Sequence, residues 1–287
     1  MTLADWFAPP AKLKVVTVQP RLLATLEGYA VEGGFDRPHE PTTCYRPTIA
    51  LGRHEGPGDA QGLWRDYERV IDLAATLGID GLRMSVEWAR VEPRQGQVDA
   101  AALDRYAQVA AHARALGLLV TVSIIDAAWP SWLGQEAWLL PWVVPCAVLQ
   151  AQRVVTHLDS AADRVVVFTD PDGLVTNGYL NAMAPPWRRG ASQDAASART
   201  QIEEILRLLR DDEVVGAKMV GDTKTFALGL TPEEIEWARA SSKDCEEIYL
   251  RSLVKGAGPT AAATALLERH DNEWSLSTAS QQLRAWR

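Results

Sequence analysis

Apolar residues recur at helical spacing in two stretches of the chain, and a glycine ends each stretch. In the first stretch, 63–78, the apolar stripe consists of Leu63, Tyr67, Val70, Ile71, Ala74 and Leu77. Such a stripe predicts a helix that packs one face against a core, and Gly78 can close it in the left-handed conformation. In the second stretch, Asp99 can cap the first turn and Gly117 can close the last one. We therefore expect helices over 63–78 and 99–117.

Short runs rich in β-branched residues lie between and after these helices. The runs span residues 81–86, 118–125, 164–169 and 214–220, and their apolar character suits parallel strands that are buried on both faces. Alternation of helix and strand predicts right-handed βαβ units and a parallel sheet, either open or closed into a barrel. A (β/α) barrel is favoured, because no glycine-rich phosphate loop follows the first strand and polar residues gather just after the strands' carboxyl ends.

One of these strand ends concentrates charge. Residues 81–93 read Gly-Leu-Arg-Met-Ser-Val-Glu-Trp-Ala-Arg-Val-Glu-Pro, so Arg83, Glu87, Trp88 and Arg90 gather at the rim of a buried strand. Charged side chains are rarely buried unless they are paired. The pattern therefore indicates a binding rim more than a stabilising one.

The composition is that of one globular domain, which we expect to span residues 1–287. Apolar residues make up 47% and charged residues 23% of the chain, and no linker rich in Pro, Gly or Ser divides it. The formal net charge of -8 argues against a nucleic-acid partner. The chain does not open with a basic segment followed by an apolar one, and no apolar stretch approaches the ~20 residues that span a bilayer. We therefore expect a cytoplasmic protein without a membrane partner.

The run 81–93, together with the helix before it, resembles the second βα segment of glycoside hydrolase family 1, the β-glucosidase type of retaining glycosidase. Further segments are similar to the same family: Gly-Tyr-Ala-Val-Glu-Gly at 28–33, Trp-Pro-Ser-Trp-Leu at 129–133, Phe-Thr-Asp-Pro at 168–171, and residues 232–259. The resemblance covers roughly the first five βα units and implies an α/β fold like the TIM barrel. It also implies a long helix over 232–253.

Departures from the family pattern fall on the residues that carry its chemistry. Retaining glycosidases use two carboxyl groups about 5 Å apart, one as acid/base and one as nucleophile. The resemblance puts Asp170 at the acid/base glutamate, one methylene shorter, and Thr169 at the asparagine before it. It puts Ala30 at a sugar-binding glutamine and Asp126 at a histidine. The nucleophile motif Thr-Glu-Asn-Gly does not occur in the sequence, so we expect that retaining hydrolysis is lost.

The last part of the chain also departs from the family. We expect a divergent C-terminal segment, 259–287, in place of the family's last βα units, and hence an incomplete or modified barrel. The open edges of such a sheet attract another strand or another chain. Residues 14–18, Lys-Val-Val-Thr-Val, lie in a possible extra N-terminal strand segment, 1–20. Either this strand covers an edge or two copies pair, and we expect a homodimer.

Three residues are the candidates for catalysis: Asp170, Asp126 and Arg83. Asp126 and Asp170 follow adjacent predicted strands, so their carboxyl groups are expected to converge, and two close carboxylates push one pKa upward to give an acid and a base. The resemblance makes Arg83 the arginine that supports the nucleophile, and it stays charged at any working pH. Structural roles stay open, because both aspartates also fit turns and Arg83 also fits a buried salt bridge.

Six residues are the candidates for substrate binding at the same rim: Glu32, Trp88, Trp129, Thr169, Tyr179 and Asp222. Flat indole faces stack well on rings, so we expect a small ligand that is sugar-like or a polycyclic natural product. Glu32 and Asp222 also fit a structural role and a surface turn. Several carboxylates on one rim can hold a divalent ion, but no spacing signature supports one, and we expect no metal and no cofactor.

These features support a leading hypothesis and two rivals. The leading hypothesis is an enzyme derived from the family 1 barrel that performs acid/base chemistry, a cyclisation, elimination or rearrangement, on a small molecule in a biosynthetic pathway. The first rival is a noncatalytic pseudo-glycosidase that binds a sugar or glycoside. The second is residual glycoside hydrolysis of the inverting type, which needs two carboxyl groups ~6.5–9.5 Å apart.

Overall fold

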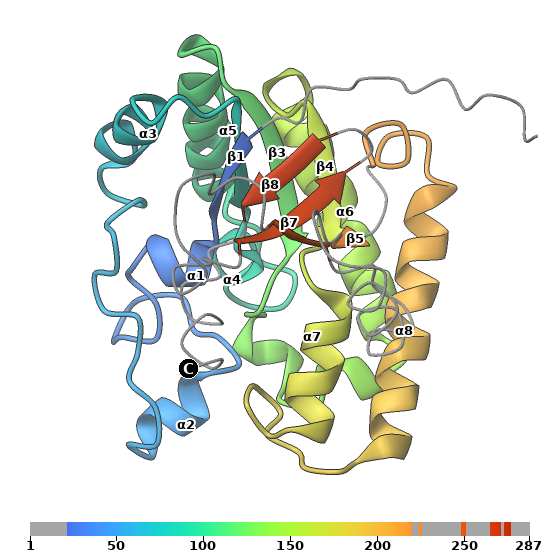
Figure 1. The fold of residues 1–287 in the computed structure, drawn as a ribbon. Coiled ribbons are helices and arrows are strands. Elements are labelled where there is room, and N and C mark those ends of the chain that lie inside the picture. The colour runs from blue at the N-terminus through green and yellow to red at the C-terminus, as the bar shows by residue number, and fades with distance from the viewer. Residues whose placement is uncertain (1–21, 220–223, 226–247, 251–264, 271–272, 277–287) are drawn as a thin grey trace, which may run out of the picture.

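The fold is built on four neighbouring parallel strands and the helices between them (Figure 1). The computed structural model describes residues 22–219, 224–225, 248–250, 265–270 and 273–276. The strands are β1 (Leu22–Leu26), β2 (Gly81–Ser85), β3 (Leu119–Ile125), β4 (Arg164–Phe168), β5 (Lys224–Thr225), β6 (Ile248–Leu250), β7 (Ala265–His270) and β8 (Glu273–Leu276). The helices are α1 (Gly28–Val31), α2 (Arg46–Ala50), α3 (Tyr67–Ala75), α4 (Trp88–Val91), α5 (Ala100–Ala115), α6 (Val143–Leu158), α7 (Pro171–Val175) and α8 (Ser192–Arg210). Shorter turns are η2 (Ser131–Leu133), η3 (Ala137–Leu139), η4 (Asp159–Ala161) and the π-helical η5 (Thr176–Leu180).

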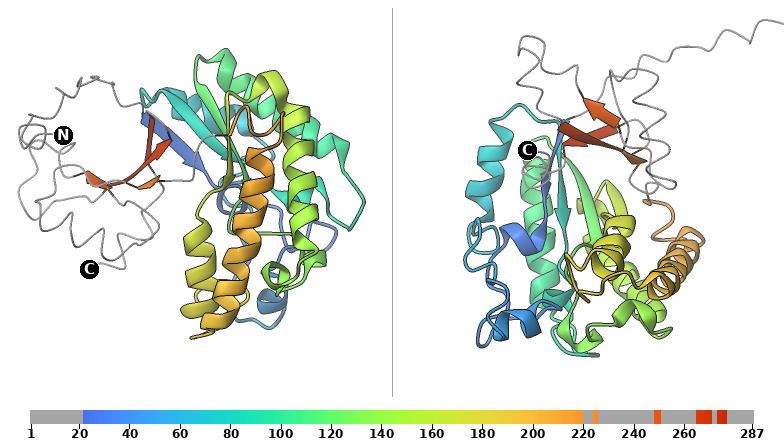
Figure 2. Two further views of the ribbon diagram at one scale, coloured as in Figure 1. Left: turned by 90° about the vertical axis from the view of Figure 1, so that its right-hand side faces the viewer. Right: turned by 60° about the horizontal axis from the view of Figure 1, so that its bottom comes forward.

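The sheet has the strand order β4-β3-β2-β1-β8-β7-β5, and β6 pairs with β7. Strands β1 to β4 run parallel, and β8 lies parallel to β1 on its other side. Helices α5 and α6 contact β3, while α3 packs on α5 and α8 packs on α6. Figure 2 shows these helices as a layer along the parallel strands. The predicted α/β fold is confirmed through β4.

The side chains of β2 and β3 alternate between an apolar face and a polar one. The apolar face, which belongs to the core under the helices, carries Leu82, Met84, Val120, Val122 and Ile124. The polar face carries Thr25, Arg83, Ser85, Thr121 and Ser123, each at most 5% exposed. Register aligns Thr25, Arg83 and Thr121 in one row, because paired residues of neighbouring strands share a face. Both faces of these strands are buried, as predicted, and one of the two buried faces is polar.

The predicted helices and the first predicted strands are confirmed, with shorter bounds. Asp99 caps α5 by accepting a hydrogen bond from the backbone nitrogen of Ala102 at 3.1 Å. Gly78 (φ 68°) and Gly117 (φ 81°) have the left-handed conformation that ends a helix. Helix α3 begins at Tyr67, four residues later than its apolar stripe. Local spacing thus located these helices and strands to within about four residues.

The predicted strand over 214–220 is wrong at residues 214–218, which form a turn. Asp212 accepts hydrogen bonds from the backbone nitrogens of Val214 (2.9 Å) and Val215 (2.8 Å), and these bonds bend the backbone. Only Met219 forms a parallel bridge, to Val165 of β4, among the residues described there.

Two predictions concern the chain ends. The helix expected over 232–253 is wrong at 248–250, which is strand β6, and its remainder lies outside the described residues. The N-terminal run 14–18 also lies outside them. Within the described C-terminal segment, β8 occupies the edge of β1, so a strand from the segment 259–287 covers one edge of the parallel sheet. Along the described chain, no helix combines the length and the apolar character that crossing a membrane requires.

Candidate functional site

Arg83 lies among carboxylates that follow three different strands. The residue comes from the middle of β2, and it is 1% exposed. Burial lowers the pKa of its guanidinium, and the negative charges of Asp126, Glu27 and Asp170 oppose that shift. Asp126 directly follows β3, Glu27 directly follows β1, and Asp170 stands two residues after the end of β4. We call Glu27, Asp126 and Asp170 the acidic ring. The guanidinium of Arg83 is the positive charge on which these three carboxylates act.

Asp126 and Asp170 line one pocket, as their positions after adjacent strands predict. Asp126 accepts hydrogen bonds from the Ser85 hydroxyl at 2.6 Å and from the backbone nitrogen of Ala127 at 2.9 Å. Asp170 caps α7 by accepting a hydrogen bond from the backbone nitrogen of Gly173 at 2.7 Å. The pocket has a volume of about 100 Å³, and its apolar walls include Ile125, Trp129, Phe168 and Leu174. The geometry brings the two aspartates together; their catalytic roles stay predictions.

Glu87 is a further acid beside this ring. It is 2% exposed, and its Oε1 accepts a hydrogen bond from the backbone nitrogen of Tyr29 at 3.0 Å. Burial raises the pKa of Glu87 well above its ordinary value, and the negative charges of Glu32 and Asp126 raise it further. A Cβ on Gly28 would stand 2.4 Å from Glu87 Oε1, so only glycine leaves room for this carboxyl group. Glu87 therefore holds a proton at pH values where exposed carboxyl groups are ionised.

Replacing Glu87 with glutamine is expected to stabilise the protein at neutral pH by about 1–3 kcal/mol, the size typical of single substitutions, because glutamine is neutral without a bound proton. The unfolded chain releases the Glu87 proton near the ordinary pKa of 4.5, whereas the folded protein keeps it to higher pH. Folding stability of the parent protein consequently falls as pH rises above that value. Glutamine still accepts from Tyr29 and has no such proton. Urea unfolding at about pH 5 and about pH 7.5 measures the difference; parallel profiles for both proteins would contradict it.

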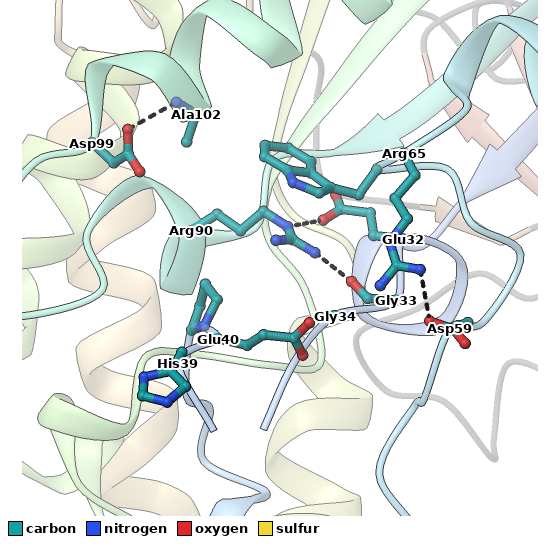
Figure 3. A pocket seen from close by; sticks show the side chains of 12 residues that line it. Glu32, Gly33, Gly34, His39, Glu40, Asp59, Arg65, Arg90, Asp99 and Ala102 are labelled. Atoms are coloured by element: carbon teal, nitrogen blue, oxygen red, sulfur yellow. Dashed lines mark hydrogen bonds and ion pairs between the residues drawn. The ribbon is translucent and has the colours of Figure 1, made fainter. Parts of the chain in front are cut away.

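Glu32 lies in a different pocket, of about 290 Å³ (Figure 3). One of its carboxylate oxygens accepts a hydrogen bond from Arg90 Nε at 2.5 Å, and the other accepts from the Tyr106 hydroxyl at 2.8 Å. The Arg90 guanidinium lies 4.1 Å from the ring centroid of Phe35 and 4.0 Å from that of Trp64. Glu32 therefore joins α1 to α4 and α5, and its carboxylate is occupied by this ion pair.

The two predicted indoles differ in position. Trp88 and Trp129 are each 1% exposed. Trp88 donates from Nε1 to Glu92 at 3.3 Å and packs edge-on against Trp132, in the interior and away from the pocket. Trp129 donates from Nε1 to the Gly134 carbonyl at 2.8 Å, and it does line the pocket of Asp126 and Asp170. Only the second indole therefore reaches the acidic ring.

The remaining predicted binding residues lie after β4, in η5 and outside the described part. Thr169 is 5% exposed and donates its backbone N–H to the Ile125 carbonyl at 3.0 Å. Tyr179, in η5, is fully buried, and burial is the main cause of a raised hydroxyl pKa. Asp222 lies outside the described residues. Within the described part, no three or more His, Cys, Asp or Glu side chains are grouped so that they could hold a metal ion.

Comparison with known proteins identifies the family of this chain. Residues 29–282 match the sequence description of glycosyl hydrolase family 1. This chain belongs to glycosyl hydrolase family 1. Over 181 residues it is 27% identical to the rice (Oryza sativa subsp. japonica) protein named β-glucosidase-like SFR2, chloroplastic, and over 148 residues it is 24% identical to a β-glucosidase of Agrobacterium sp.. These matches cover 61% and 51% of this chain but only 28% and 32% of the two relatives.

Solved structures of similar proteins confirm the fold of this family 1 chain. The β-glycosidase from Pyrococcus horikoshii superposes with a TM-score of 0.60 at 19% identity, over 77% of this chain and 52% of that one. A structure described as aphid myrosinase superposes with a TM-score of 0.64 at 13% identity, over 75% and 50%. At these identities the likeness concerns the fold alone. The described part of the protein therefore has a TIM-barrel-like fold, and the chain spans about half the length of these structures.

Sequence patterns do not select every residue of this family 1 site. Glu27 and Glu87 follow strands β1 and β2, which is the same signal that selects Asp126 and Asp170. Tyr45 carries no such signal, because it lies in a loop without periodicity. Burial, the adjoining Cys44 and the negative charges of Asp126, Glu87 and Glu27 raise the pKa of the Tyr45 hydroxyl. The phenol of Tyr45 therefore lies among the acids of the site.

Proposed function

We propose that this family 1 protein performs acid/base chemistry on a small organic molecule at the pocket of Asp126 and Asp170, and that it no longer carries out retaining glycoside hydrolysis. The observation that supports the proposal best is the meeting of these two carboxylates in one pocket beside the buried guanidinium of Arg83. Neighbouring carboxyl groups in unlike environments can divide the roles of acid and base.

Each group has a separate part in such chemistry. Asp170 or Asp126 removes a proton from the substrate, and Glu87 is the buried acid from which a proton returns to the site. Arg83 stabilises the negative charge that develops on the substrate after proton removal. The apolar walls formed by Trp129 and Phe168 orient the molecule and exclude water. A cyclisation or rearrangement needs one proton removed and one returned, and the proton that the aspartate has taken must then pass to Glu87 to restore the starting state.

Glycoside hydrolysis is the main competing function, since one similar protein is named β-glucosidase and another is named β-glucosidase-like. Retaining hydrolysis requires an acid/base and a nucleophile about 5 Å apart. Asp170 is shorter than the family's glutamate, and one of its oxygens accepts from Gly173. The sequence contains no Thr-Glu-Asn-Gly motif. These features favour other chemistry at the same pocket.

A noncatalytic pseudo-glycosidase is the second candidate, and one observation favours it. Asp126 and Asp170 both accept backbone hydrogen bonds, from Ala127 and Gly173, as aspartates that only stabilise turns do. Such a protein would bind a sugar or glycoside in the pocket and leave it unchanged.

Asp170→Asn and Arg83→Gln are each expected to lower conversion of the substrate at least about 100-fold. Incubation of the protein in D₂O with a small-molecule extract of its source cells provides an assay, because mass spectrometry detects molecules that exchange protons or rearrange. Circular dichroism shows whether each variant stays folded. Arg69→Gln is the matched control, because Arg69 pairs with Asp66 on the exposed surface of the molecule. Conversion that persists in both variants would show the catalytic assignment to be wrong.

Retaining hydrolysis is tested directly with 2,4-dinitrophenyl 2-deoxy-2-fluoro-β-D-glucoside, a reagent that traps the glycosyl-enzyme intermediate. We expect no covalent adduct in the intact mass of the protein. A stoichiometric adduct with release of dinitrophenol would overturn the proposed loss of hydrolysis. Binding of a glucoside with no conversion of any molecule in the extract would favour the noncatalytic candidate.

A further inference from the structure

Helix α6 carries an exposed apolar stripe. Its buried side packs against β3, α5 and α8. By contrast, Trp142, at the N-cap of the helix, is 38% exposed and Leu149 is 53% exposed. The partly exposed Cys146 lies between them in the sequence, and we call these three residues the α6 stripe. Because α6 already contacts both neighbouring helices, the stripe belongs to no contact within the described helix layer.

The α6 stripe lies in a part of the chain without charge. Residues 137–152 contain no charged side chain, although Lys, Arg, Asp and Glu make up 23% of the sequence. The exposed face of a surface helix normally carries charged and polar residues. Two copies of a chain with a net charge of -8 repel each other, so they approach most easily through a neutral face. The stripe therefore fits a second copy of the chain better than an acidic or basic partner.

Spacing along α6 also matches a second copy that runs in the opposite direction. Trp142, Cys146, Leu149 and Arg153 follow one another at intervals of 4, 3 and 4 residues, an order that reads the same from both ends. Intervals of 3 and 4 are those of helices that pack lengthwise along a narrow seam. A two-fold axis at the middle of this run sets Trp142 of one copy opposite Arg153 of the other. The same axis sets Cys146 opposite Leu149.

Each end of this seam joins an aromatic ring to a cation. Trp142 stacks on Trp132 with ring centroids 6.3 Å apart and an interplanar angle of 24°, which limits the rotation of its indole before association. Arg153 donates from Nη1 to Glu92 Oε2 at 3.1 Å, and its side chain is 18% exposed. A guanidinium is attracted to the face of an indole. Two-fold symmetry forms this contact twice.

We propose that two copies of this protein associate through the α6 stripe, with the two helices antiparallel about a two-fold axis. Pairing of sheet edges is the other route to a dimer. However, β8 pairs with β1 and Met219 bridges Val165 of β4, so each outer edge of the four parallel strands already has a neighbour. No residue of the stripe lines the pocket of Asp126 and Asp170. The inference is therefore independent of the proposed function.

Sedimentation velocity tests the contact. We expect the parent protein to sediment as a dimer at micromolar concentration. Leu149→Glu places an unpaired carboxylate in the seam and should raise the dissociation constant at least about tenfold, with an unchanged melting temperature because Leu149 is exposed. Leu73→Glu is the matched control, since Leu73 is a 60% exposed leucine of α3, and it should sediment like the parent. A monomeric parent, or a dimer that Leu149→Glu leaves intact, would overturn the proposal.

Crosslinking tests the antiparallel arrangement itself. The two copies of Cys146 lie close to the proposed axis, within reach of the short thiol crosslinker bismaleimidoethane, whereas Cys44 is fully buried. We expect a product of twice the mass from Cys245→Ser protein and none from Cys146→Ser protein. A product that persists without Cys146, or no product from either variant, would overturn the contact. A parent protein that is monomeric and binds phosphatidylcholine vesicles would assign the stripe to a lipid surface instead.

Discussion

Arg90→Met is expected to lower the free energy of unfolding by about 3–5 kcal/mol, because it leaves the buried carboxylate of Glu32 without its partner. The side chains of the ion pair are only 5% and 1% exposed, and the two groups are 2.5 Å apart. Methionine fills most of the space that the Arg90 side chain occupies between Phe35 and Trp64. The lost free energy of unfolding therefore reflects the missing charge more than missing packing. Urea unfolding at neutral pH measures it.

The loss in the free energy of unfolding caused by Arg90→Met should also depend on pH. Burial raises the pKa of Glu32, and the charge and hydrogen bond of Arg90 oppose the rise. Without Arg90 the pKa rises further, so the folded variant keeps a proton that the unfolded chain releases near 4.5. The deficit should therefore grow as pH rises above that value and shrink as pH falls towards it.

Two further variants complete the Arg90 experiment. Arg69→Met removes an exposed pair with Asp66, whose side chains are 60% and 54% exposed, and should cost less than about 1 kcal/mol. Adding Glu32→Gln to Arg90→Met should recover part of the loss, because it removes the buried charge. Two results would contradict the claim that Arg90 compensates the buried carboxylate of Glu32. One is an equal loss in the free energy of unfolding for Arg90→Met and Arg69→Met, and the other is a loss for Arg90→Met that is the same at every pH.

The parts of the fold that sequence predicts are those that local spacing determines. The apolar stripe before Gly78 and the cap at Asp99 depend on residues within a few positions, and both appear as expected. The meeting of Asp126 and Asp170 follows from one further rule, since neighbouring parallel strands end at the same edge of a sheet. Their shared pocket required no knowledge of distant contacts.

The side-chain partners that the sequence does not predict depend on contacts between distant segments. Glu32 follows a strand end, yet Arg90, 58 positions later in the chain, draws its carboxylate into a separate pocket. Trp88 stands at the same rim by sequence, but its indole turns into the interior towards Glu92. Nothing in the spacing of either residue shows which partner it meets. The turn at 214–218 differs for a local reason, because the side chain of Asp212 competes with strand formation.

The acidic ring changes the meaning of the family resemblance. Arg83 keeps its place in the family motif, while its carboxylate neighbours come from Asp126, Glu27 and Asp170. Among these, Asp126 stands where the resemblance places a histidine, so one neutral or positive group has become an acid. Because the nucleophile motif Thr-Glu-Asn-Gly is absent from the sequence, the resemblance removes one carboxylate where Asp126 adds another, so the acids are redistributed around Arg83. Retention of the scaffold is therefore compatible with a change of substrate.

Gly81→Ala is expected to destabilise the protein by about 3 kcal/mol, the upper end of the usual cost of overpacking. Gly81 pairs with Leu23 of β1 and Leu119 of β3. A Cβ at this position would stand 2.4 Å from the Leu119 carbonyl oxygen and 2.5 Å from Leu23 Cδ2. The carbonyl belongs to the backbone and cannot rotate away, so β2 must move relative to β3. The expected fall in melting temperature is roughly 6–12 °C.

The same displacement connects stability with the site, because Arg83 and Ser85 follow Gly81 on the same face of β2. A shift of the strand moves the Ser85 hydroxyl away from Asp126, which it contacts at 2.6 Å, and Gly81→Ala should therefore also lower conversion of the substrate in the D₂O assay. Gly56→Ala is the control, since its nearest neighbour would be Ile49 Cδ1 at an ordinary 3.6 Å, and it should change stability by less than about 0.5 kcal/mol. If calorimetry gave the two variants equal melting temperatures, the close approach of β2 and β3 at Gly81 would not limit stability.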